Sequence, residues 1–331
     1  MDRFRVAVTD FIVDDLAPER ERLDQIADVV ALDLKSETEL IARVGEFDAI
    51  MAFHKLPWTR AVLATMSRCK ILVRCGVGYD NVDTAYARSV GLDVANVPDY
   101  GTEEIADSAI GLMLALVRGI NLLNNRLQRG LGPWNHTQAA PVHRLRGRVY
   151  GIIGCGHIGT AAALRAKALG MDVVYFDPYK PAGFDKSLGI RSVESLEELV
   201  KQSFVVSPHC LLTPETTNLI DAKAIAMMPP GSFIVNTSRG AVVDLQAVVA
   251  AIESGHLAGA GIDVLPEEPP AEDHPLIVAW RNPASRCHDR VIINPHAAFY
   301  SVEGLFEMRS KGAEACRRAL SGLPVKTIVN R

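Results

Sequence analysis

Three polar residues in the second half of the chain have side chains that could cooperate in one reaction. Arg239, Glu268 and His296 each follow a short apolar run of the kind that forms a buried strand. An imidazole exchanges a proton near neutral pH, and a carboxylate beside it favours its protonated form and fixes its tautomer. A planar guanidinium binds a substrate carboxylate. These groups suit the oxidation of a hydroxyl to a ketone next to a carboxylate, with His296 taking the proton while a hydride leaves.

The apolar runs before these residues predict strands of one parallel sheet. They cover 232–236, 259–264 and 291–294, within an array of alternating strands and helices from 149 to about 294. Because ligands bind at the carboxyl ends of such strands, the three side chains should converge. Taken singly, they could instead be an ordinary ion-pair partner, a solvated loop acid and a helix cap, in that order.

A glycine-rich segment, GCGHIG, lies between an apolar strand at 149–153 and an alanine-rich helix. In this GxGxxG pattern the first glycine allows a tight turn, the second lets the backbone approach a pyrophosphate, and the third allows close helix–strand packing. The free N–H groups at the start of the helix then meet the phosphate charge. The predicted cofactor contacts here are Gly154, Gly156, His157, Ile158 and Gly159.

An acidic residue follows the next strand of this array. That strand, 172–176, ends on Asp177, about twenty residues beyond the glycines, where a carboxylate accepts hydrogen bonds from a ribose diol and repels a 2′-phosphate. The sequence therefore predicts NAD rather than NADP as the cofactor. The alternative is that Asp177 is an exposed strand-end carboxylate without a ligand.

The first part of the chain also alternates strands and helices. Apolar runs at 5–9, 29–34, 48–53, 71–74 and 92–95 predict a second doubly wound parallel sheet. A long helix then opens near Thr102, and its apolar positions step by three and four as far as Leu127. A loop over 130–148 comes before the second array, and a last helix over 301–320 follows it.

The last helix should return to the first array, so that the chain crosses twice between domains. On that arrangement a flavodoxin-like substrate domain comprises 1–100 and 300–331, and a Rossmann NAD-binding domain, 101–299, is inserted into it. Two crossings create a cleft, which is the usual place for a ligand.

Composition excludes several other classes of function. The chain has 331 residues, a formal net charge of -4 and 48% hydrophobic residues, which argues against nucleic acid as a partner. It contains no apolar run long enough to span a bilayer and no signal-peptide pattern at its start. Six cysteines without a CxxC pair indicate buried free thiols in the cytoplasm, and no metal site is expected.

The motifs occur together in the order and spacing of the D-isomer specific 2-hydroxyacid dehydrogenases, and the sequence resembles that family over nearly its whole length. The shared segments are GIIGCGHIG, the acid after the next strand, VNTSRGAVVD, GAGIDV followed by EEP, and PHAA. The resemblance implies the reaction D-2-hydroxy acid + NAD⁺ ⇌ 2-oxo acid + NADH + H⁺ and a homodimer. It also selects Glu268, immediately before the proline, over Glu267 as the partner of His296.

The same resemblance implies further contacts. Asp263 resembles the aspartate that holds the nicotinamide carboxamide, and the CGVGY turn resembles backbone that meets the substrate carboxylate. The remaining cofactor contacts would be Val77, Cys210, Thr216, Thr237, Ser238, Arg239 and His296. The substrate contacts would be His54, Val77, Gly78, Arg239, His296 and Phe299.

Within the family, the nearest resemblance is to the branch of the C-terminal binding protein corepressors. It is carried by VRCGVGYDNVD, by ALRAKALG with the FDPY turn, and by PHAAFYS. In that branch a histidine that points at the substrate pocket stands at the place of His54, and a tryptophan stands at the place of Phe299. Two stretches depart from the pattern: 270–290 is longer than usual, and GPW at 132–134 follows the enzyme branches.

Other functions stay open at this point. One is a corepressor-like scaffold that senses NAD, and another is a dehydrogenase acting on phosphite or a phosphorylated hydroxy acid. Phe299, expected at the start of the last helix, should form an aromatic wall with Tyr79 and His54 that favours 2-oxo acids with a modest uncharged tail. The alternative is that Phe299 is core packing. The apolar helix from Thr102 and the loop through Trp134 favour a two-fold dimer.

Overall fold

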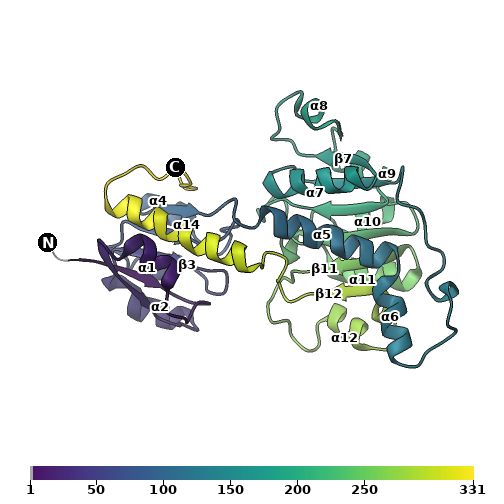
Figure 1. The fold of residues 1–331 in the computed structure, drawn as a ribbon, viewed down its shortest axis with the longest axis horizontal. Helices are drawn as coiled ribbons and strands as arrows, with labels where there is room; N and C mark the ends of the chain where they lie inside the picture. The colour runs from purple at the N-terminus through teal and green to yellow at the C-terminus, as the bar shows by residue number, and fades with distance from the viewer. Residues whose placement is uncertain (1–2) are drawn as a thin grey trace. The chain divides into compact units, whose positions relative to one another are not determined.

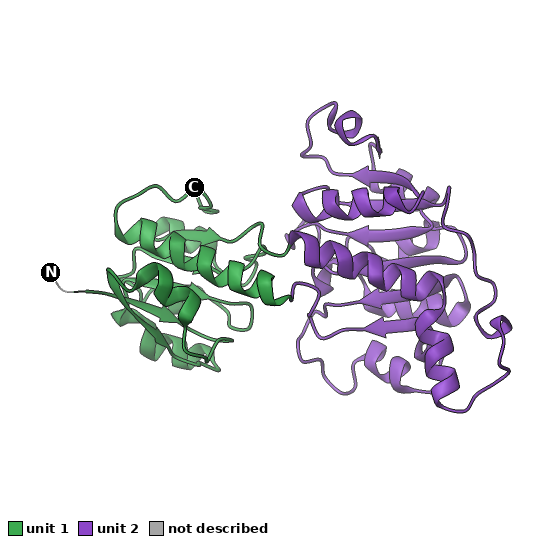
Figure 2. Cartoon of the chain, in the orientation of Figure 1, with its two compact units in different colours: residues 1–101, 301–331 green, residues 102–300 purple. Residues whose placement is uncertain are grey.

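The computed structural model describes residues 3–331, which form two compact α/β units (Figure 1, Figure 2). Unit 1 consists of Met1–Gly101 and Ser301–Arg331, and unit 2 is Thr102–Tyr300. The chain therefore leaves unit 1 after completing the sheet of that unit, and it returns to unit 1 with the last helix.

Unit 1 is built on a five-stranded parallel sheet with the order β2-β1-β3-β4-β5. The strands are β1 (Phe4–Val8), β2 (Ala27–Ala31), β3 (Ala49–Ala52), β4 (Ile71–Arg74) and β5 (Asp93–Asn96). The helices are α1 (Ala17–Leu23), α2 (Glu37–Arg43), α3 (Arg60–Leu63), α4 (Thr84–Ser89) and α14 (Val302–Leu320).

Alternate residues of these strands face helices on opposite sides of the sheet. Gly312 of α14 lies so close to Met51 and Val73 that a Cβ on it would come within 3.0 Å of the Met51 side chain. Leu40 of α2 instead packs with Ile50, in a core that also contains residues of α3 and α4. Because successive strand residues point to opposite faces, both faces of the sheet are buried and the strands read as continuous apolar runs.

Unit 2 contains a seven-stranded parallel sheet with the order β12-β11-β10-β9-β6-β7-β8. The strands are β6 (Val149–Ile153), β7 (Asp172–Phe176), β8 (Arg191–Ser192), β9 (Val205–Pro208), β10 (Ser232–Asn236), β11 (Leu257–Ile262) and β12 (Val291–Ile293). The strand order reverses between β6 and β9, which is the topological switch point where doubly wound sheets bind ligands. The predicted fold class, two doubly wound parallel-sheet domains, is confirmed.

Helices cover both faces of this sheet (Figure 1). Helices α5 (Thr102–Val117) and α7 (His157–Ala168) share one core with the sheet. The other core is formed with α9 (Leu196–Gln202), α10 (Ala222–Met227), α11 (Leu245–Ser254), α12 (Pro275–Arg281) and α13 (Cys287–Arg290). Two further helices are α6 (Ile120–Gln128) and α8 (Phe184–Leu188).

Some predicted boundaries are wrong by a few residues. The strand predicted at 29–34 is Ala27–Ala31, because the apolar run continues into Leu32 and Leu34, which pack in the core from the following loop. The strand predicted at 259–264 is Leu257–Ile262. The last helix begins at Val302 with Ser301 as its N-cap, so Phe299 lies in the turn before the helix and not at its start.

The single long helix predicted from Thr102 to Leu127 is also wrong. Helix α5 ends at Val117 and α6 begins at Ile120, with an angle of 63° between them. Gly119 adopts a φ of 65°, the left-handed conformation that ends helices and favours glycine. Among residues 3–331 no single helix is long and apolar enough to cross a membrane; α5 and α6 meet the length and composition criterion only as this bent pair.

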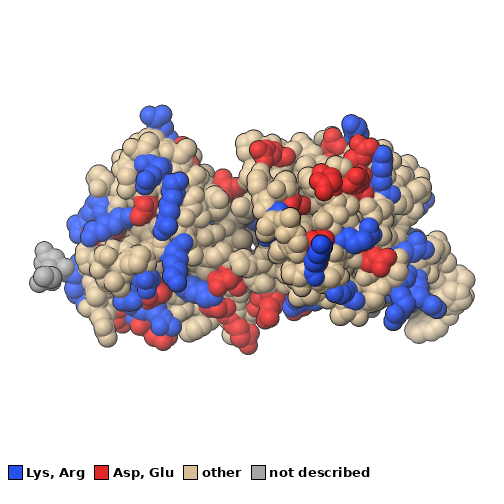
Figure 3. All heavy atoms as spheres, turned by 90° about the horizontal axis from the view of Figure 1, so that it is seen from above, with Lys and Arg blue, Asp and Glu red and all other residues tan. Residues whose placement is uncertain are grey.

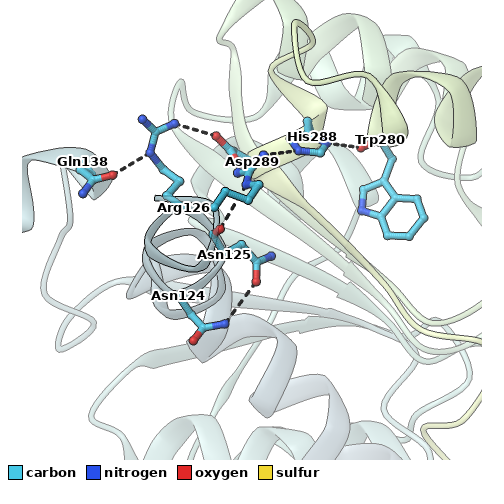
Figure 4. Close-up of polar contacts among 8 residues, drawn as sticks. Asn124, Asn125, Arg126, Gln138, Trp280, His288 and Asp289 are labelled. Carbon is cyan, nitrogen blue, oxygen red and sulfur yellow. Dashed lines mark hydrogen bonds and ion pairs between the residues drawn. The ribbon is translucent and has the colours of Figure 1, made fainter. Parts of the chain in front are cut away.

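The stretch that is longer than usual, 270–290, forms α12 and α13 and is fastened to α6 (Figure 4). Arg126 of α6 donates from Nε to Gln138 at 2.7 Å and from Nη1 to Asp289 at 3.1 Å. Arg129 reaches the other oxygen of Asp289 at 2.6 Å. Ion pairs at Asp289 thus link the end of this stretch to the helix that precedes the 130–148 loop.

Surface charge is mixed on both units. On the face shown in Figure 3, both basic and acidic side chains occur on each unit. This agrees with the near balance of 35 basic and 39 acidic residues in the sequence.

A buried ion network fixes α14 to α1 within unit 1. Arg309, 5% exposed, donates two hydrogen bonds of 2.7 Å to Glu19, which has no exposed surface. It donates two more of 2.7 Å to Asp14. Removing one partner of a buried pair leaves the other charge uncompensated, so this network should be sensitive to truncation.

We predict that Arg309→Met lowers the free energy of unfolding by about 3–5 kcal/mol, because Glu19 stays buried without its partner. The matched control is Arg317→Met on the same helix, whose ion pair with Glu314 is 35% exposed on each side and should contribute below about 1 kcal/mol. Urea unfolding at neutral pH measures both losses. Equal losses for the two variants would contradict this role of Arg309.

Candidate active site

Three loops of unit 2 begin at the same level of the sheet. Asn236 of β10 pairs with Ile262 of β11, and Ile262 pairs with Ile293 of β12, so these neighbouring strands end in register. The loops that follow carry Arg239, Glu268 and His296. The sheet register therefore brings the three sequence-predicted loops to one edge.

Glu268 and His296 are in direct contact. Nδ1 of His296 lies 2.7 Å from Oε2 of Glu268, and the side chains are 21% and 30% exposed. The other carboxylate oxygen, Oε1, accepts the backbone N–H of Leu265 at 2.8 Å. With Glu268 bound at Nδ1, the imidazole has Nε2 as its atom for proton exchange with a ligand.

The backbone of His296 is held in place by Asp263. His296 has a φ of 52°, an unusual conformation for a residue other than glycine. Its N–H donates to the carbonyl of Asp263 at 2.7 Å, and the N–H groups of Ala297 and Ala298 donate to the Asp263 carboxylate at 2.9–3.1 Å. Asp263 is 1% exposed, and burial raises the pKa of its carboxyl. The end of β11 thus sets where the imidazole stands.

Arg239 lies in a loop organised by a buried asparagine. Asn236, with no exposed surface, donates from Nδ2 to the carbonyl of Arg239 at 2.8 Å and accepts from the N–H and hydroxyl of Ser238 at 3.0 and 2.9 Å. The guanidinium donates from Nη1 to the Ser238 carbonyl at 2.8 Å. Ser238 therefore supports Arg239 through its backbone, while its hydroxyl is bound within the loop.

The glycine motif lies at the switch point of the same sheet. Ile153 of β6 pairs with Phe176 of β7 and with Pro208 of β9, so Gly154, Asp177 and His209 follow their strands at one level. Gly154 has a φ of 85°, and a Cβ on it would lie 2.9 Å from the backbone of Cys210. These constraints explain the first glycine of the motif.

Gly159 has its predicted packing role, and the surroundings of Gly156 are open. A Cβ on Gly159 of α7 would lie 2.2 Å from the carbonyl oxygen of Gly154, so only glycine lets the helix approach the strand end. A Cβ on Gly156, the N-cap of α7, would meet no atom within 4 Å. Open space there, with the N–H groups of His157 and Ile158 at the start of a 12-residue helix, suits a pyrophosphate.

Asp177 has hydrogen bonds that orient its carboxylate toward this motif. Oδ2 accepts the N–H of Cys155 at 2.8 Å, and Oδ1 accepts the N–H of Tyr179 at 3.0 Å. The Tyr179 hydroxyl in turn donates to Glu215 at 2.9 Å. Asp177, which follows β7, is therefore hydrogen-bonded to the turn after β6 and is not an isolated carboxylate in solvent.

Two buried polar atoms fit a bound cofactor. Within the part of the chain that the structure describes, Oγ1 of Thr237 and Nδ1 of His209 are buried and make no hydrogen bond. Buried polar groups in proteins are almost always satisfied, so such atoms beside a ligand edge indicate a missing partner. The donors and acceptors of a dinucleotide would supply one.

Cys210 and Thr216 bound the loop after β9. Burial raises the pKa of the Cys210 thiol to about 11, so it stays protonated, and Cys210 lies against Gly154. The Thr216 hydroxyl donates to the carbonyl of Leu211 at 2.6 Å and accepts the N–H of Thr213 at 2.8 Å. In this structure Thr216 stabilises the loop itself.

The predicted residues of unit 1 follow two neighbouring strands. Ala52 of β3 pairs with Arg74 of β4, so His54, Val77 and Gly78 lie at the same edge of the unit 1 sheet. The carbonyl of Val77 accepts the Asn96 side chain at 2.8 Å.

Phe299 of unit 2 packs edge-on against His296, with ring centroids 6.1 Å apart. Its ring therefore lies beside the imidazole although it precedes the last helix. The described residues contain no group of three or more His, Cys, Asp or Glu that could hold a metal ion.

Sequence reasoning missed two residues that organise the site, His209 and Asn236. Each ends or follows a strand of the sheet at the ligand edge, and each is a polar residue after an apolar run. That position was the available signal, but neither belongs to a motif whose chemistry is evident from residue type.

A glycine-rich turn at the switch point, an acid after the second strand and a histidine–carboxylate pair define an NAD-binding oxidoreductase. The family model described as "D-isomer specific 2-hydroxyacid dehydrogenase, NAD binding domain" matches residues 110–298. The chain therefore belongs to the D-isomer specific 2-hydroxyacid dehydrogenase family, whose cofactor is NAD.

Curated relatives and a solved structure agree with this assignment. The chain is 35% identical to a glyoxylate reductase of Korarchaeum cryptofilum, over 90% of this chain and 88% of the relative. It is 32% identical to a D-3-phosphoglycerate dehydrogenase of Methanocaldococcus jannaschii, over 98% of this chain but 59% of that longer protein. The structure of a D-lactate dehydrogenase from Aquifex aeolicus in complex with NAD and lactic acid is similar, with a TM-score of 0.82, 27% identity and 96% of each chain covered.

The half-buried His209, whose Nδ1 is buried, should make stability depend on pH. Burial lowers the pKa of His209 from 6.5 to about 4. As the pH falls from 6.5 to 4, the unfolded chain takes up a proton that the folded state refuses, so stability is full above that window and is lost within it.

We predict that the wild-type protein loses up to roughly 3 kcal/mol across this window through His209, and that His209→Gln has a smaller loss. Urea unfolding at a series of pH values measures it, with the exposed His143→Gln as control. The same pH dependence in all three proteins would contradict the prediction.

Proposed function

We propose that this protein interconverts a D-2-hydroxy acid and its 2-oxo acid, with His296 as the acid/base. The observation that supports it is the 2.7 Å contact between His296 and Glu268 at the ligand edge of an NAD-binding sheet. When bound, NAD supplies the acceptor for the hydride of the hydroxy acid.

The residues then have distinct tasks. His296 removes the hydroxyl proton during oxidation and returns it during reduction, and Glu268 stabilises the protonated imidazole. Arg239 holds the substrate carboxylate and polarises the oxygen next to it. Asp263 holds the His296 backbone and, as the family resemblance implies, the carboxamide of the cofactor.

The cofactor contacts that we propose run along the switch point of unit 2. Gly156 and the N–H groups that follow it would meet the pyrophosphate, Asp177 the ribose diol, and Thr237 the buried side of the cofactor, where its hydroxyl has no other partner in the described chain. Asp177 should favour NAD over NADP.

We propose His54, Val77, Gly78 and Phe299 as further substrate contacts, and an acid with a modest uncharged tail as substrate. A second candidate is a phosphorylated hydroxy acid, which is favoured by the similarity to the D-3-phosphoglycerate dehydrogenase. Comparing 2-oxo acids that have an uncharged tail with phosphorylated ones distinguishes the two candidates.

Three further proposals concern assembly, kinship and location. A homodimer is favoured by exposed apolar side chains on α6 and in the loop beyond it, Ile120 at 58% and Trp134 at 87% exposed. Kinship to the C-terminal binding protein branch rests on the sequence segments VRCGVGYDNVD and PHAAFYS. The free cysteines suit the cytoplasm.

We expect His296→Ala to lose on the order of 10²–10⁴-fold in turnover, with NADH binding little changed. The measurement is NADH consumption with a panel of 2-oxo acids, including glyoxylate and phosphorylated acids. The control is His256→Ala, at the amino end of β11, where the imidazole only contacts the carbonyl of Ile225 at 2.9 Å. Full turnover in His296→Ala would contradict the assignment.

Glu268→Gln should shift the pH profile of ketone reduction. Reduction needs a protonated imidazole, and the lost carboxylate no longer stabilises that form, so the rate should decline at lower pH than in the wild type. Identical profiles would show that Glu268 does not tune His296.

Asp177→Ala should lower the preference for NADH over NADPH by about tenfold or more, because one charged hydrogen bond and one repulsion are lost. The ratio of kcat/KM for the two cofactors measures it. Asp172→Ala, at the opposite end of the same strand, is the matched control. If the ratio in Asp177→Ala equals that of the wild type, Asp177 does not contact the ribose.

A further inference from the structure

Two side chains from other segments make hydrogen bonds to the backbone around His54. On one side, Oδ1 of Asp10, which lies in the loop after β1, accepts the N–H of Phe53 at 3.2 Å. On the other side, Nδ2 of Asn81 donates to the carbonyl of Phe53 at 2.9 Å and to that of Leu56 at 2.8 Å. The loop that presents His54 is therefore fixed by two side chains from other segments.

Asp10 holds this loop although burying its carboxyl group is energetically unfavourable. It is 2% exposed, and its Oδ1 also accepts the Thr9 hydroxyl at 2.8 Å. Its Oδ2 is buried without a hydrogen-bond partner among residues 3–331. A buried carboxyl with an unsatisfied oxygen costs stability, and such costs are typical of ligand edges where the position of a loop matters.

The next residue, Phe11, has a strained backbone. Its φ is 69°, and the N–H of Ile12 donates across it to the carbonyl of Asp10 at 2.8 Å. This is the rarer, strained form of a γ-turn, in which a bulky side chain is unfavourable. Such strain persists where the surrounding structure over-determines it, and it concentrates at binding sites.

The strained turn places the Phe11 ring against the imidazole. The ring centroids of Phe11 and His54 are 5.3 Å apart with an edge-on angle of 64°, and the Phe53 ring lies 5.5 Å away. Nζ of Lys55 lies 5.4 Å from the centroid of the same ring. Phe11 therefore contacts all three consecutive residues of the loop, and its contact with His54 restricts the rotation of that imidazole.

We propose that Phe11, next to Asp10, is a positioning residue that fixes the His54 imidazole and thereby strengthens binding of the 2-oxo acid. The proposal rests on the proposed function, in which His54 contacts the substrate. An imidazole that is ordered before binding loses less conformational freedom when substrate arrives, so the effect should fall on KM rather than on kcat.

The test is a double-mutant cycle with the favoured 2-oxo acid and NADH. Phe11→Leu should raise KM for the acid about two- to tenfold, the range expected for ordering one side chain, with kcat and the KM for NADH little changed. Phe11→Tyr, which keeps an aromatic ring, should have the wild-type KM. In the His54→Ala background, Phe11→Leu should have no further effect on KM, because Phe11 acts through His54.

Two more variants separate positioning from folding. Phe4→Leu is the matched control: Phe4 lies at the other end of β1, is half-buried and has Nζ of Lys70 4.8 Å from its ring. It should leave KM for the acid unchanged. If Phe11→Leu fails to fold, Phe11→Gly relieves the strained φ while removing the ring, and it should raise KM in the same way.

The possible outcomes separate the role of Phe11 from the proposed dehydrogenase function. An unchanged KM in Phe11→Leu, or an equal rise with and without His54, overturns the inference while an active wild type leaves the function standing. A wild type that reduces no 2-oxo acid in the panel overturns the proposed function and this inference with it.

Discussion

The buried carboxylate of Asp263 is the constraint on which the catalytic edge depends. It accepts the N–H groups of Ala297 and Ala298, while its backbone carbonyl accepts the N–H of His296. These bonds hold His296 at a φ of 52°, a conformation that the chain would not otherwise favour. Because Asp263 directly follows β11, which pairs with strands on both sides, the position of the imidazole is set by the sheet, and Glu268 contacts it there.

Parallel strand register organises the rest of the edge. The strands β10, β11 and β12 end level with one another and carry the acid–base groups, and β6, β7 and β9 end level and carry the dinucleotide motif. The register of the strands thus brings together loops that are far apart in sequence, and contacts between the loops are not needed for this. Fine adjustment is left to buried polar residues such as Asn236 and Asp10, each of which holds a loop by its backbone.

The sequence was sufficient for features that depend on local pattern. Apolar runs located most strands, and strand-end residues led to the expectation of a carboxylate beside His296; the family resemblance then selected Glu268, whose Oε2 lies 2.7 Å from His296 Nδ1. It was insufficient where distant segments decide. The break at Gly119 interrupts an apolar periodicity that continues on both sides, so the pattern alone predicted one helix. The strain at Phe11 and the burial of His209 are imposed by tertiary neighbours and leave no signature in residue type.

The central claim is direct hydride transfer to the carbon that bears the oxo group of a 2-oxo acid, with D stereochemistry. The most direct measurement supplies NADH deuterated at its transferable position, together with the best 2-oxo acid of the panel, and analyses the product by mass and by chiral chromatography. The account predicts a D-2-hydroxy acid that carries the deuterium at the former carbonyl carbon. A product without deuterium at that carbon, or one of L configuration, would contradict it.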